Sequence, residues 1–419
     1  MRRRRRWLGI AGTVGMLVAL SAAVFTRGAW VAHGAPGHAL SHIAPAAPAV
    51  ASASCARLGH WNIAPTPGFP NSVLYAVASV TGSDVWAVGQ AEPGTLEQTL
   101  IENWNGSKWS VIASPNPGSY DALYGVAALS ATDIWAVGYY QSSSDLTLIE
   151  HWDGTQWSVI ASPNTSPNQN YLYAVSAVSA NDVWAVGYYV SNATGSPEQT
   201  LTEHWNGTTW SVVPSFSVSG GESELLGVTA ISTNDVWAVG FGAGTLIEHW
   251  NGTVWTAVPS LSGGNSGFAA VSAVSSSDVW AVGGDDYDES LTAHWNGTSW
   301  SLVGSPNPSL SGAPLQSVAA FSAHDVWAVG FSLDNNGNVL TLTEHWDGSA
   351  WSIATSANTA DALDTLDGVA GFANDVWAVG SEQTNTGTLA EHYHSILQGA
   401  PGGTARGTSR RPGSAILCP

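Results

Sequence analysis

Apolar and polar positions alternate in short runs along most of this chain, and turns rich in small and polar residues separate the runs. In one stretch the pattern predicts four strands, over residues 123–129, 133–139, 146–152 and 156–161. Side chains in a strand point to opposite faces in turn, so this alternation is typical of sheets rather than helices. An Asp-Gly dipeptide joins the last two runs, and Asp-Gly is a strong signal for a hairpin.

The same arrangement recurs seven times, marked by the hexapeptide Asp-Val-Trp-Ala-Val-Gly or, once, Asp-Ile-Trp-Ala-Val-Gly. Its tryptophans are Trp86, Trp135, Trp184, Trp237, Trp280, Trp327 and Trp377. The spacing of 43 to 53 residues fits one four-stranded blade per repeat. We therefore predict an all-β fold, a seven-bladed β-propeller with four-stranded blades.

The two ends of the repeat array complement each other. The last repeat stops at residues 391–394, after its third strand, whereas residues 61–64 match a fourth strand such as residues 109–112. We predict that this N-terminal strand completes the seventh blade, which removes an open sheet edge. Cys55 and Cys418 flank the joint, and in an oxidising compartment we expect a disulfide between them.

Composition divides the chain into three parts. Residues 1–54 begin with a basic run, followed by an apolar stretch over residues 7–25 and an Ala/Pro-rich linker. This order indicates an export signal or an N-terminal membrane anchor, and the sequence leaves both alternatives open. Residues 55–396 form the predicted propeller and residues 397–419 a C-terminal tail. Both alternatives predict an extracellular or cell-surface protein, which meets the membrane only through an uncleaved N-terminal helix.

With this organisation the repeats resemble those of secreted bacterial β-propeller proteins and, more loosely, those of kelch and Asp-box propellers. The Asn/Asp-Gly-Ser/Thr-x-Trp segment is similar to an Asp-box hairpin, although the Ser-x-Asp that precedes the glycine in that motif is absent. The similarity covers roughly residues 60–396. It implies the fold, and because propellers host many unrelated activities it implies no particular activity.

Several residue types recur at fixed places in the repeats, and we interpret them as structural. The 20 tryptophans of the propeller are expected to pack between blades. Glu and His side chains of the third strand are expected to form hydrogen bonds between blades, and the Asp that opens each hexapeptide to cap a turn. The histidines are His151, His204, His249, His294, His345 and His392. The glutamates are Glu150, Glu203, Glu248, Glu344 and Glu391. The aspartates are Asp84, Asp133, Asp182, Asp235, Asp278, Asp325 and Asp375.

The charge of the propeller excludes several kinds of partner. Between Trp61 and Ile396 the only basic residue is Lys108, while all 31 Asp and Glu residues lie there, which gives a formal charge of −30. Such a body repels nucleic acid and anionic lipid. It also lacks the arginine cluster of a sialidase, the Cys–Tyr pair of a galactose-oxidase copper site and the basic residues of phytase-like phosphate chemistry.

Tyrosine is concentrated in the first three repeats. Three tyrosines start the first strand of these repeats, near the mouth of the central channel, and two pairs end the second strand at the same rim. Repeats 4 to 7 have other residues at the first place, so the fold does not require tyrosine there. Aromatic rings with hydroxyl groups suit sugar rings or protein surfaces. The candidate ligand-binding residues are Tyr75, Tyr124, Tyr173, Tyr139, Tyr140, Tyr188 and Tyr189. The alternative is that these repeats are recent duplicates that share their tyrosines.

One loop of the fifth repeat is acidic, with Asp285, Asp286, Asp288 and Glu289 close together. Carboxylate oxygens are the ligands that Ca²⁺ prefers, so the loop is a candidate calcium site, with a solvated loop as the alternative. No other cofactor is predicted.

These features lead to one expectation about function and one alternative. We expect a monomeric, non-enzymatic binding module outside the cytoplasm, which recognises glycan or protein through the variable loops and the tyrosine rim. The many carboxylates on those loops leave a carboxylate-based glycoside hydrolase or lyase as the alternative.

Overall fold

The computed structural model of this protein describes residues 59–395 apart from 70, 192–195, 286, 288, 309–311, 360–362 and 383–386. All of them belong to one unit, Leu58–Leu397. The predicted export segment, the C-terminal tail and both cysteines lie outside the described residues, and so does the predicted disulfide. In the part of the chain that is described, no helix is long and apolar enough to cross a membrane.

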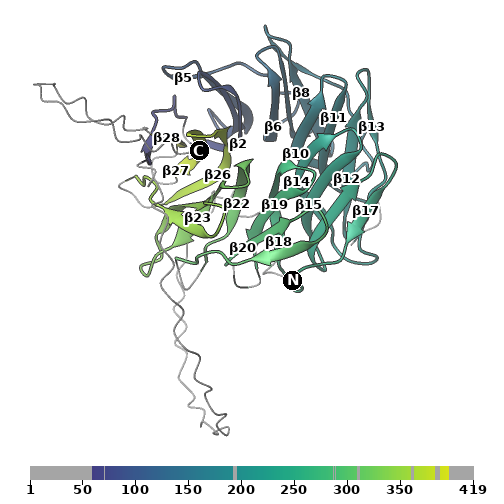
Figure 1. The fold of residues 1–419 in the computed structure, drawn as a ribbon. Coiled ribbons are helices and arrows are strands. Elements are labelled where there is room, and N and C mark those ends of the chain that lie inside the picture. The colour runs from purple at the N-terminus through teal and green to yellow at the C-terminus, as the bar shows by residue number, and fades with distance from the viewer. Residues whose placement is uncertain are drawn as a thin grey trace, which may run out of the picture. The chain divides into compact units, whose positions relative to one another are not determined.

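In the described part of the chain, twenty-eight strands form seven blades of four strands each. The blades lie around a common axis (Figure 1), which confirms the predicted propeller. We call the strands of a blade A to D from the axis outward and number the blades from the first A strand. The A strands are β2 (Val73–Thr81), β6 (Asp121–Ser130), β10 (Gln169–Ser179), β14 (Glu224–Ser232), β18 (Gly267–Ser275), β22 (Leu315–Ser322) and β26 (Asp364–Phe372). The B strands are β3 (Asp84–Ala91), β7 (Asp133–Gln141), β11 (Asp182–Val190), β15 (Asp235–Gly242), β19 (Asp278–Gly284), β23 (Asp325–Leu333) and β27 (Asp375–Glu382).

The outer half of each blade contains the C and D strands. The C strands are β4 (Gln98–Trp104), β8 (Asp145–Trp152), β12 (Glu198–Trp205), β16 (Gly244–Trp250), β20 (Ser290–Trp295), β24 (Val339–Trp346) and β28 (Gly387–Ser395). The D strands are β5 (Trp109–Val111), β9 (Trp157–Val159), β13 (Trp210–Val212), β17 (Trp255–Val258), β21 (Trp300–Val303), β25 (Trp351–Ala354) and β1 (Gly59–Ile63). The four strands predicted for the second repeat agree with β6 to β9 within two residues at each end.

The seventh blade closes as predicted. Its D strand is the N-terminal strand β1, which pairs antiparallel with β28 so that Trp61 lies opposite Tyr393. Trp61 is 5% exposed and packs against Trp327 of blade 6, with ring centroids 5.4 Å apart. The edge of β28 is therefore covered, and the sheet exposes no long unpaired strand at the joint.

Tryptophans pack between blades, as the repeat pattern predicts. At the boundary of blades 2 and 3, Trp135 on a B strand lies 5.2 Å from Trp205 and 5.5 Å from Trp210 of the next blade. The same group of rings recurs at the other boundaries, and at the closing joint Tyr393 and Trp61 supply two of them. Each boundary thus buries a cluster of large apolar rings, which stabilises the packing of neighbouring blades.

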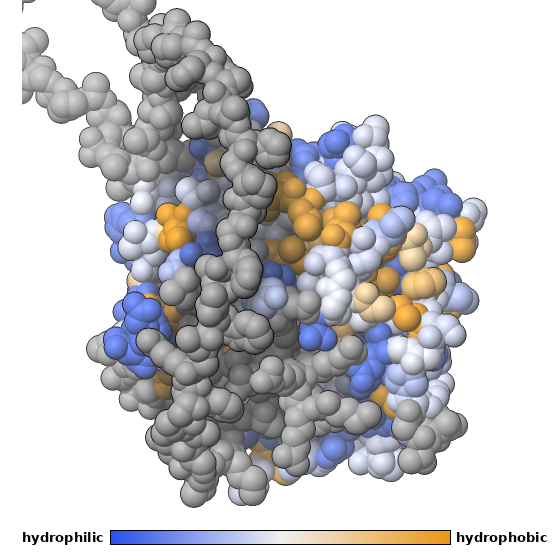
Figure 2. Space-filling view, turned by 90° about the horizontal axis from the view of Figure 1, so that it is seen from below, coloured by the Kyte–Doolittle hydropathy of each residue, from blue (hydrophilic) through white to orange (hydrophobic). Residues whose placement is uncertain are grey.

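The D strands also bring apolar side chains to the surface. Two positions after each buried tryptophan, an exposed aliphatic residue recurs in most blades, so the repeat distributes these residues around the rim. They are Ile63, Val111, Val159, Val212, Leu302 and Ile353. Figure 2 shows one face of the molecule, on which hydrophobic side chains gather between hydrophilic ones.

Candidate functional site

Each A strand carries a β-bulge at the same place, next to the axis. The register shift leaves one residue unpaired in every blade, and a bulge redirects the side chain of its extra residue. The bulge residues are Tyr75, Tyr124, Tyr173, Leu226, Ala269, Gln316 and Asp367. Three tyrosines therefore occupy consecutive positions of a ring that holds smaller or non-aromatic residues elsewhere. Their ring centroids are 5.0 Å apart between Tyr75 and Tyr124 and 5.2 Å between Tyr124 and Tyr173.

Three further tyrosines extend this row outward. Tyr139 stacks on Tyr124 at 6.0 Å and contacts Tyr171 at 4.6 Å. Tyr188 stacks on Tyr171 at 5.0 Å, because the two are direct cross-strand partners, and on Tyr173 at 5.9 Å. We call the six residues the tyrosine cluster: Tyr75, Tyr124, Tyr139, Tyr171, Tyr173 and Tyr188. Tyr171 was not among the predicted residues, and its place opposite Tyr188 in the A–B register is the signal that identifies it.

The other two predicted tyrosines do not join the cluster. Tyr140 packs against the apolar layer between blades 1 and 2 that contains Trp86. Tyr189 packs into the next such layer, and its hydroxyl donates to Oε1 of Gln199 at 2.9 Å. Neighbouring residues of a strand point to opposite faces, so only one member of each Tyr-Tyr pair can face the cluster.

Acceptor groups surround the cluster on its loop side. The hydroxyl of Tyr171 donates to Oδ2 of Asp145 at 2.5 Å. The amide groups of Gln141 and Gln169 also donate to Asp145, at 3.2 and 3.3 Å. The same aspartate begins β8 and forms the one bridge that links the sheets of blades 2 and 3, where Asp145 pairs with Gln169. A fixed carboxylate therefore holds one edge of the tyrosine cluster in place.

Burial keeps the cluster protonated. Burial, followed by nearby carboxylates of which Glu97 is the first, raises the pKa of Tyr139 to about 12. Burial also raises the pKa of Tyr75, Tyr124 and Tyr173 well above the ordinary value of 10.0. At neutral pH the hydroxyls are therefore hydrogen-bond donors, beside carboxylates that can only accept when they are ionised.

Asp367 of blade 7 occupies the bulge next to that of Tyr75 and ends the row of tyrosines. Burial raises the pKa of this carboxyl group to about 7, and the hydrogen bond from the Thr365 hydroxyl, at 3.2 Å, opposes the rise. The row thus runs from a titratable carboxyl group through aromatic rings to Leu226.

The predicted calcium loop is only partly described. Asp286 and Asp288 lie outside the described residues. Oδ1 of Asp285 accepts the backbone N–H groups of Tyr287 at 2.8 Å and Glu289 at 3.1 Å, so this oxygen shapes the turn of the loop. Calcium binding by this loop stays a prediction.

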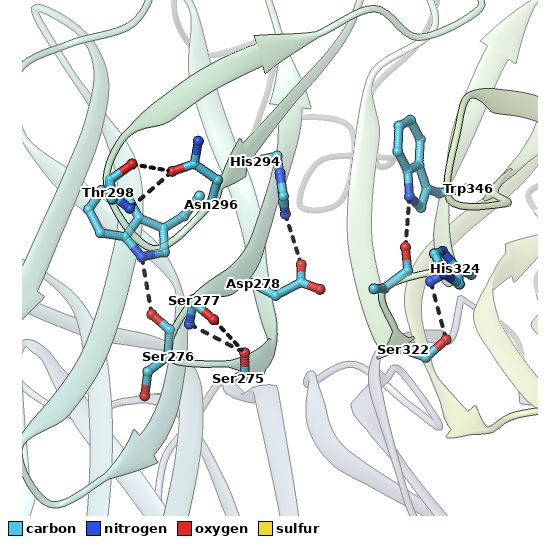
Figure 3. Close-up of polar contacts among 12 residues, drawn as sticks. Ser275, Ser276, Ser277, Asp278, His294, Asn296, Thr298, Ser322, His324 and Trp346 are labelled. Atoms are coloured by element: carbon cyan, nitrogen blue, oxygen red, sulfur yellow. Dashed lines mark hydrogen bonds and ion pairs between the residues drawn. The ribbon is translucent and has the colours of Figure 1, made fainter.

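The recurrent histidines pair inside a blade, so the prediction of hydrogen bonds between blades is wrong for them. Nε2 of His151 lies 2.9 Å from Oδ1 of Asp133 in the same blade. The other five histidines repeat this bond at 2.5 to 2.9 Å, and Figure 3 shows His294 with Asp278 in blade 5. The physical reason is the B–C register, which places His151 directly opposite Trp135, two residues after Asp133.

Oδ1 of each of these aspartates is the acceptor of a histidine bond, whereas the sequence predicted that the aspartates cap the A–B turns. In blade 1, which has Asn103 in place of histidine, Oδ1 of Asp84 accepts from the Asn103 amide at 2.9 Å and from the Trp86 indole at 2.8 Å. The turn N–H groups are bonded instead by hydroxyl groups that precede the aspartates, such as Ser322 below the N–H of His324 in Figure 3.

The glutamates of the C strands do bond between blades, as predicted, wherever a donor faces them. Oε2 of Glu248 accepts the N–H of Phe216 from the preceding blade at 3.0 Å, and Oε2 of Glu391 accepts that of Ala357 at 3.1 Å. Both donors stand six residues after the tryptophan that opens a D strand. Six glutamates at this place are fully buried: Glu102, Glu150, Glu203, Glu248, Glu344 and Glu391.

Prolines remove the same donor elsewhere. The residue six positions after the D-strand tryptophan is Pro67, Pro115, Pro163 or Pro306 in front of the other four glutamates, and proline has no N–H to donate. Hydroxyl groups compensate at two of them, from Thr388 to Glu102 at 3.2 Å and from Ser305 to Glu344. Among the described residues, neither oxygen of Glu150 or Glu203 has a hydrogen-bond partner.

Pro163→Ala is expected to stabilise the protein at pH 8, because it supplies the N–H group that Glu203 lacks. A buried acceptor that is left without a hydrogen-bond partner costs about 1–3 kcal/mol, and the loss of proline in the unfolded chain costs about 0.4–1 kcal/mol. Urea denaturation at pH 5 and pH 8 measures the gain, with Pro306→Ala as the control, since Glu344 already has the Ser305 donor. A gain that is equal in the two variants would argue against this explanation.

Blade 7 contains a cluster that the sequence analysis missed. Asp375, His392 and His394 each offer one ligand atom, and these atoms lie within 4.8 Å of one another. The recurrent set holds one histidine per repeat, and histidines spread around a ring cannot converge on one ion. The signal that identifies the cluster is the alternation His-x-His on β28, which places both rings on one face.

Comparisons with known proteins support the fold and do not identify a family. No family model matches the chain, and no curated protein matches its sequence. Among solved structures, YCF48 bound to D1 peptide is 13% identical and covers 81% of this chain and 97% of its own, with a TM-score of 0.52. YCF48 from Cyanidioschyzon merolae is 14% identical, covers 80% and 98%, and has a TM-score of 0.52.

A third solved structure with a similar fold is a WD40 β-propeller. The WD40 β-propeller domain of Doa1 is 13% identical and covers 80% of this chain and 98% of its own, with a TM-score of 0.54. Identities this low show a shared architecture alone. The protein is thus a β-propeller of seven four-stranded blades, and the comparisons place no ligand on it.

Proposed function

We propose that this protein is a non-enzymatic binding module that acts outside the cytoplasm and holds its ligand at the tyrosine cluster. The observation that carries the proposal is the row of three tyrosines at consecutive bulge positions around the axis. The fold accepts Leu226, Ala269 and Gln316 at the same place in other blades, so packing of the ring does not explain the aromatic side chains. The basic, apolar N-terminal segment supports a location outside the cytoplasm.

The chemistry of the cluster defines the class of ligand. Ring faces, hydroxyl donors and carboxylate acceptors such as Asp145 and Glu97 together suit sugar rings or a polypeptide segment. Only one basic residue lies between Trp61 and Ile396, so an anionic ligand finds no counter-charge. The ligand is therefore a neutral glycan or a neutral to basic polypeptide. The YCF48 propeller bound to D1 peptide is a reason to include peptides in the test.

Tyr124→Gln is expected to weaken binding at least about tenfold, because it removes the ring that contacts Tyr75, Tyr139 and Tyr173. Blade 6 has Gln316 at the same bulge, so the variant should keep the fold. The full-length protein is applied to glycan and peptide arrays, and the affinity for the best ligand is then measured for each variant.

Tyr189→Phe is the matched control, since this tyrosine lies outside the cluster and loses only its hydroxyl bond to Gln199. Equal affinity of wild type and Tyr124→Gln would contradict the proposed site. Release of a cleaved product from a bound glycan, abolished by Asp145→Asn, would instead establish the carboxylate hydrolase.

A further inference from the structure

The closing joint of the ring changes the role of one position on the C strand. In blades 1 to 6 the residue two positions after the His or Asn of that strand is Asn or Asp, and its Oδ1 accepts two backbone N–H groups of the C–D hairpin. These residues are Asn105, Asp153, Asn206, Asn251, Asn296 and Asp347. Blade 7 has no C–D hairpin, because its D strand comes from the N-terminal end of the propeller. The residue at this position therefore has no hairpin to stabilise in blade 7, and this residue is His394.

His394 completes a compact set of ligand atoms. Nε2 of His392 lies 2.5 Å from Oδ1 of Asp375, and the rings of His392 and His394 have centroids 4.1 Å apart at an interplanar angle of 62°. Asp375 is the direct cross-strand partner of His394, so all three side chains share one face of blade 7. Their ligand atoms lie within 4.8 Å of one another, and two of the three residues are only partly buried and the third is exposed. A small ion can therefore reach the cluster from solvent.

A fourth imidazole stands on the neighbouring strand. His60 of β1 is the direct partner of His394 on the side opposite Asp375, which makes one row across three strands. Direct cross-strand partners have Cβ atoms about 4.5–5.5 Å apart, within reach of two histidines that share a ligand. His60 is exposed, so its side chain can turn toward His394 without breaking a packed contact. At the place of His60, blades 1 and 2 have Lys108 and Gln156, so the repeat does not require histidine there.

The turn that carries Asp375 is also specific to blade 7. The A–B pairing of this blade lacks the second register shift that the other six blades have before the B strand. Asn374 adopts a φ of 74° and is held by Ser395, whose hydroxyl donates to Oδ1 of Asn374 at 2.7 Å. Gly82 of blade 1 leaves room for Oδ2 of Asp375, since a Cβ there would lie 2.4 Å from it. Three local departures from the repeat thus fix the position of this carboxylate.

We propose that Asp375, His392 and His394 bind a divalent transition-metal ion of the zinc type, with His60 as the fourth protein ligand. Imidazole nitrogens and a carboxylate oxygen are preferred ligands of Zn²⁺, which binds them at about 2.0–2.2 Å in a tetrahedral arrangement. The ligands come from β1, β27 and β28, so the ion joins the N-terminal strand to the last blade. An ion bound only by the folded protein stabilises it by mass action.

The test uses the full chain, freed of metal with a chelator and titrated with Zn²⁺ in a calorimeter. The expected result is one equivalent bound by the wild type, and an affinity at least about tenfold lower for His394→Asn. Asparagine is the residue of blades 1, 3, 4 and 5 at that place, so this variant tests the ligand rather than the fold. With Co²⁺ in place of Zn²⁺, the wild type should show the visible absorption of a tetrahedral site, and His394→Asn should not.

Two further variants separate this site from the other histidines. His345→Asn removes the equivalent His–Asp pair of blade 6, following Asn103 of blade 1, and should bind Zn²⁺ like the wild type. His60→Lys, following Lys108, should weaken binding and reduce the Zn²⁺-dependent rise in melting temperature. Equal Zn²⁺ affinity of wild type and His394→Asn would overturn the site. Unchanged affinity and an unchanged rise for His60→Lys would overturn the link to β1.

Discussion

Trp61→Ala is expected to destabilise the protein by about 3–5 kcal/mol, the cost of truncating a buried tryptophan. Trp61 is 5% exposed and lies against Trp327 and Tyr393, with centroids 5.4 and 5.5 Å away. The variant also weakens the closure of the ring, because β1 is held in its sheet by its pairing with β28 and no hairpin joins the two strands. Urea denaturation at a fixed pH measures the total.

Trp109→Ala is the matched control for this prediction. Trp109 opens the D strand of blade 1, is 4% exposed and contacts Trp377 at 5.2 Å, so its packing is equivalent. Its strand follows the C strand of the same blade through a hairpin, and the blade should stay assembled. Amide hydrogen exchange should therefore accelerate along β28 in Trp61→Ala and stay slow along β4 in Trp109→Ala. Equal protection of the two C strands would contradict the role of Trp61 in closure.

Raising the pH from 5 to 8 is expected to lower the free energy of unfolding by at least about 3 kcal/mol. Burial raises the pKa of Glu150 to about 8 and that of Glu102, Glu248 and Glu344 to about 7, from an ordinary 4.5. Within this window the native state holds protons that the unfolded chain has already released. The stability that these groups contribute is fully present below their ordinary pKa of about 4.5, and it is lost as the pH rises toward the native pKa values.

The chain offers a control for this pH dependence. Blade 5 has Ala293 where the other blades have glutamate, so Glu150→Ala reproduces a residue that the repeat already accepts. The double variant Glu150→Ala/Glu203→Ala should reduce the fall in stability by up to about 1.4 kcal/mol per pH unit for each carboxyl group removed. Urea denaturation in steps of half a pH unit compares the slopes, which the cost of the new cavities does not affect. An unchanged slope would contradict the assignment to these glutamates.

The fold follows from the sequence because its determinants are local or repeated. The hexapeptide sets the B strand, the Asn/Asp-Gly dipeptides set the hairpins, and the order of strands in a blade is the order in the chain. Closure by β1 was predictable for a different reason. Among the described strands, Trp61 is the one strand-D tryptophan without a preceding C strand, and Tyr393 lies on the one C strand without a following D strand.

Contacts that depend on register were harder to predict. The contact of His151 with Asp133 can be predicted only when the exact register of the B–C pairing is known. A shift of one position would move the imidazole ring to the other face of the sheet. The side of the sheet on which Tyr124 lies was hard to predict for the same reason, because the bulge in β6 changes which residue faces the axis. The missing N–H groups in front of Glu150 and Glu203 are visible as prolines in the sequence. Their effect on the glutamates can be inferred only when the packing of two neighbouring blades is known.

The way β1 completes blade 7 has a consequence for biosynthesis. The strand is made first and its partner β28 last, so more than 300 residues separate the two halves of one pairing. At a synthesis rate of about 5–20 residues per second, β1 waits roughly 15–65 s without its native partner. An unpaired strand can add to the sheet edge of another chain, and its short length of five residues limits that risk. The yield of folded protein should therefore fall as the local concentration of unfinished chains rises.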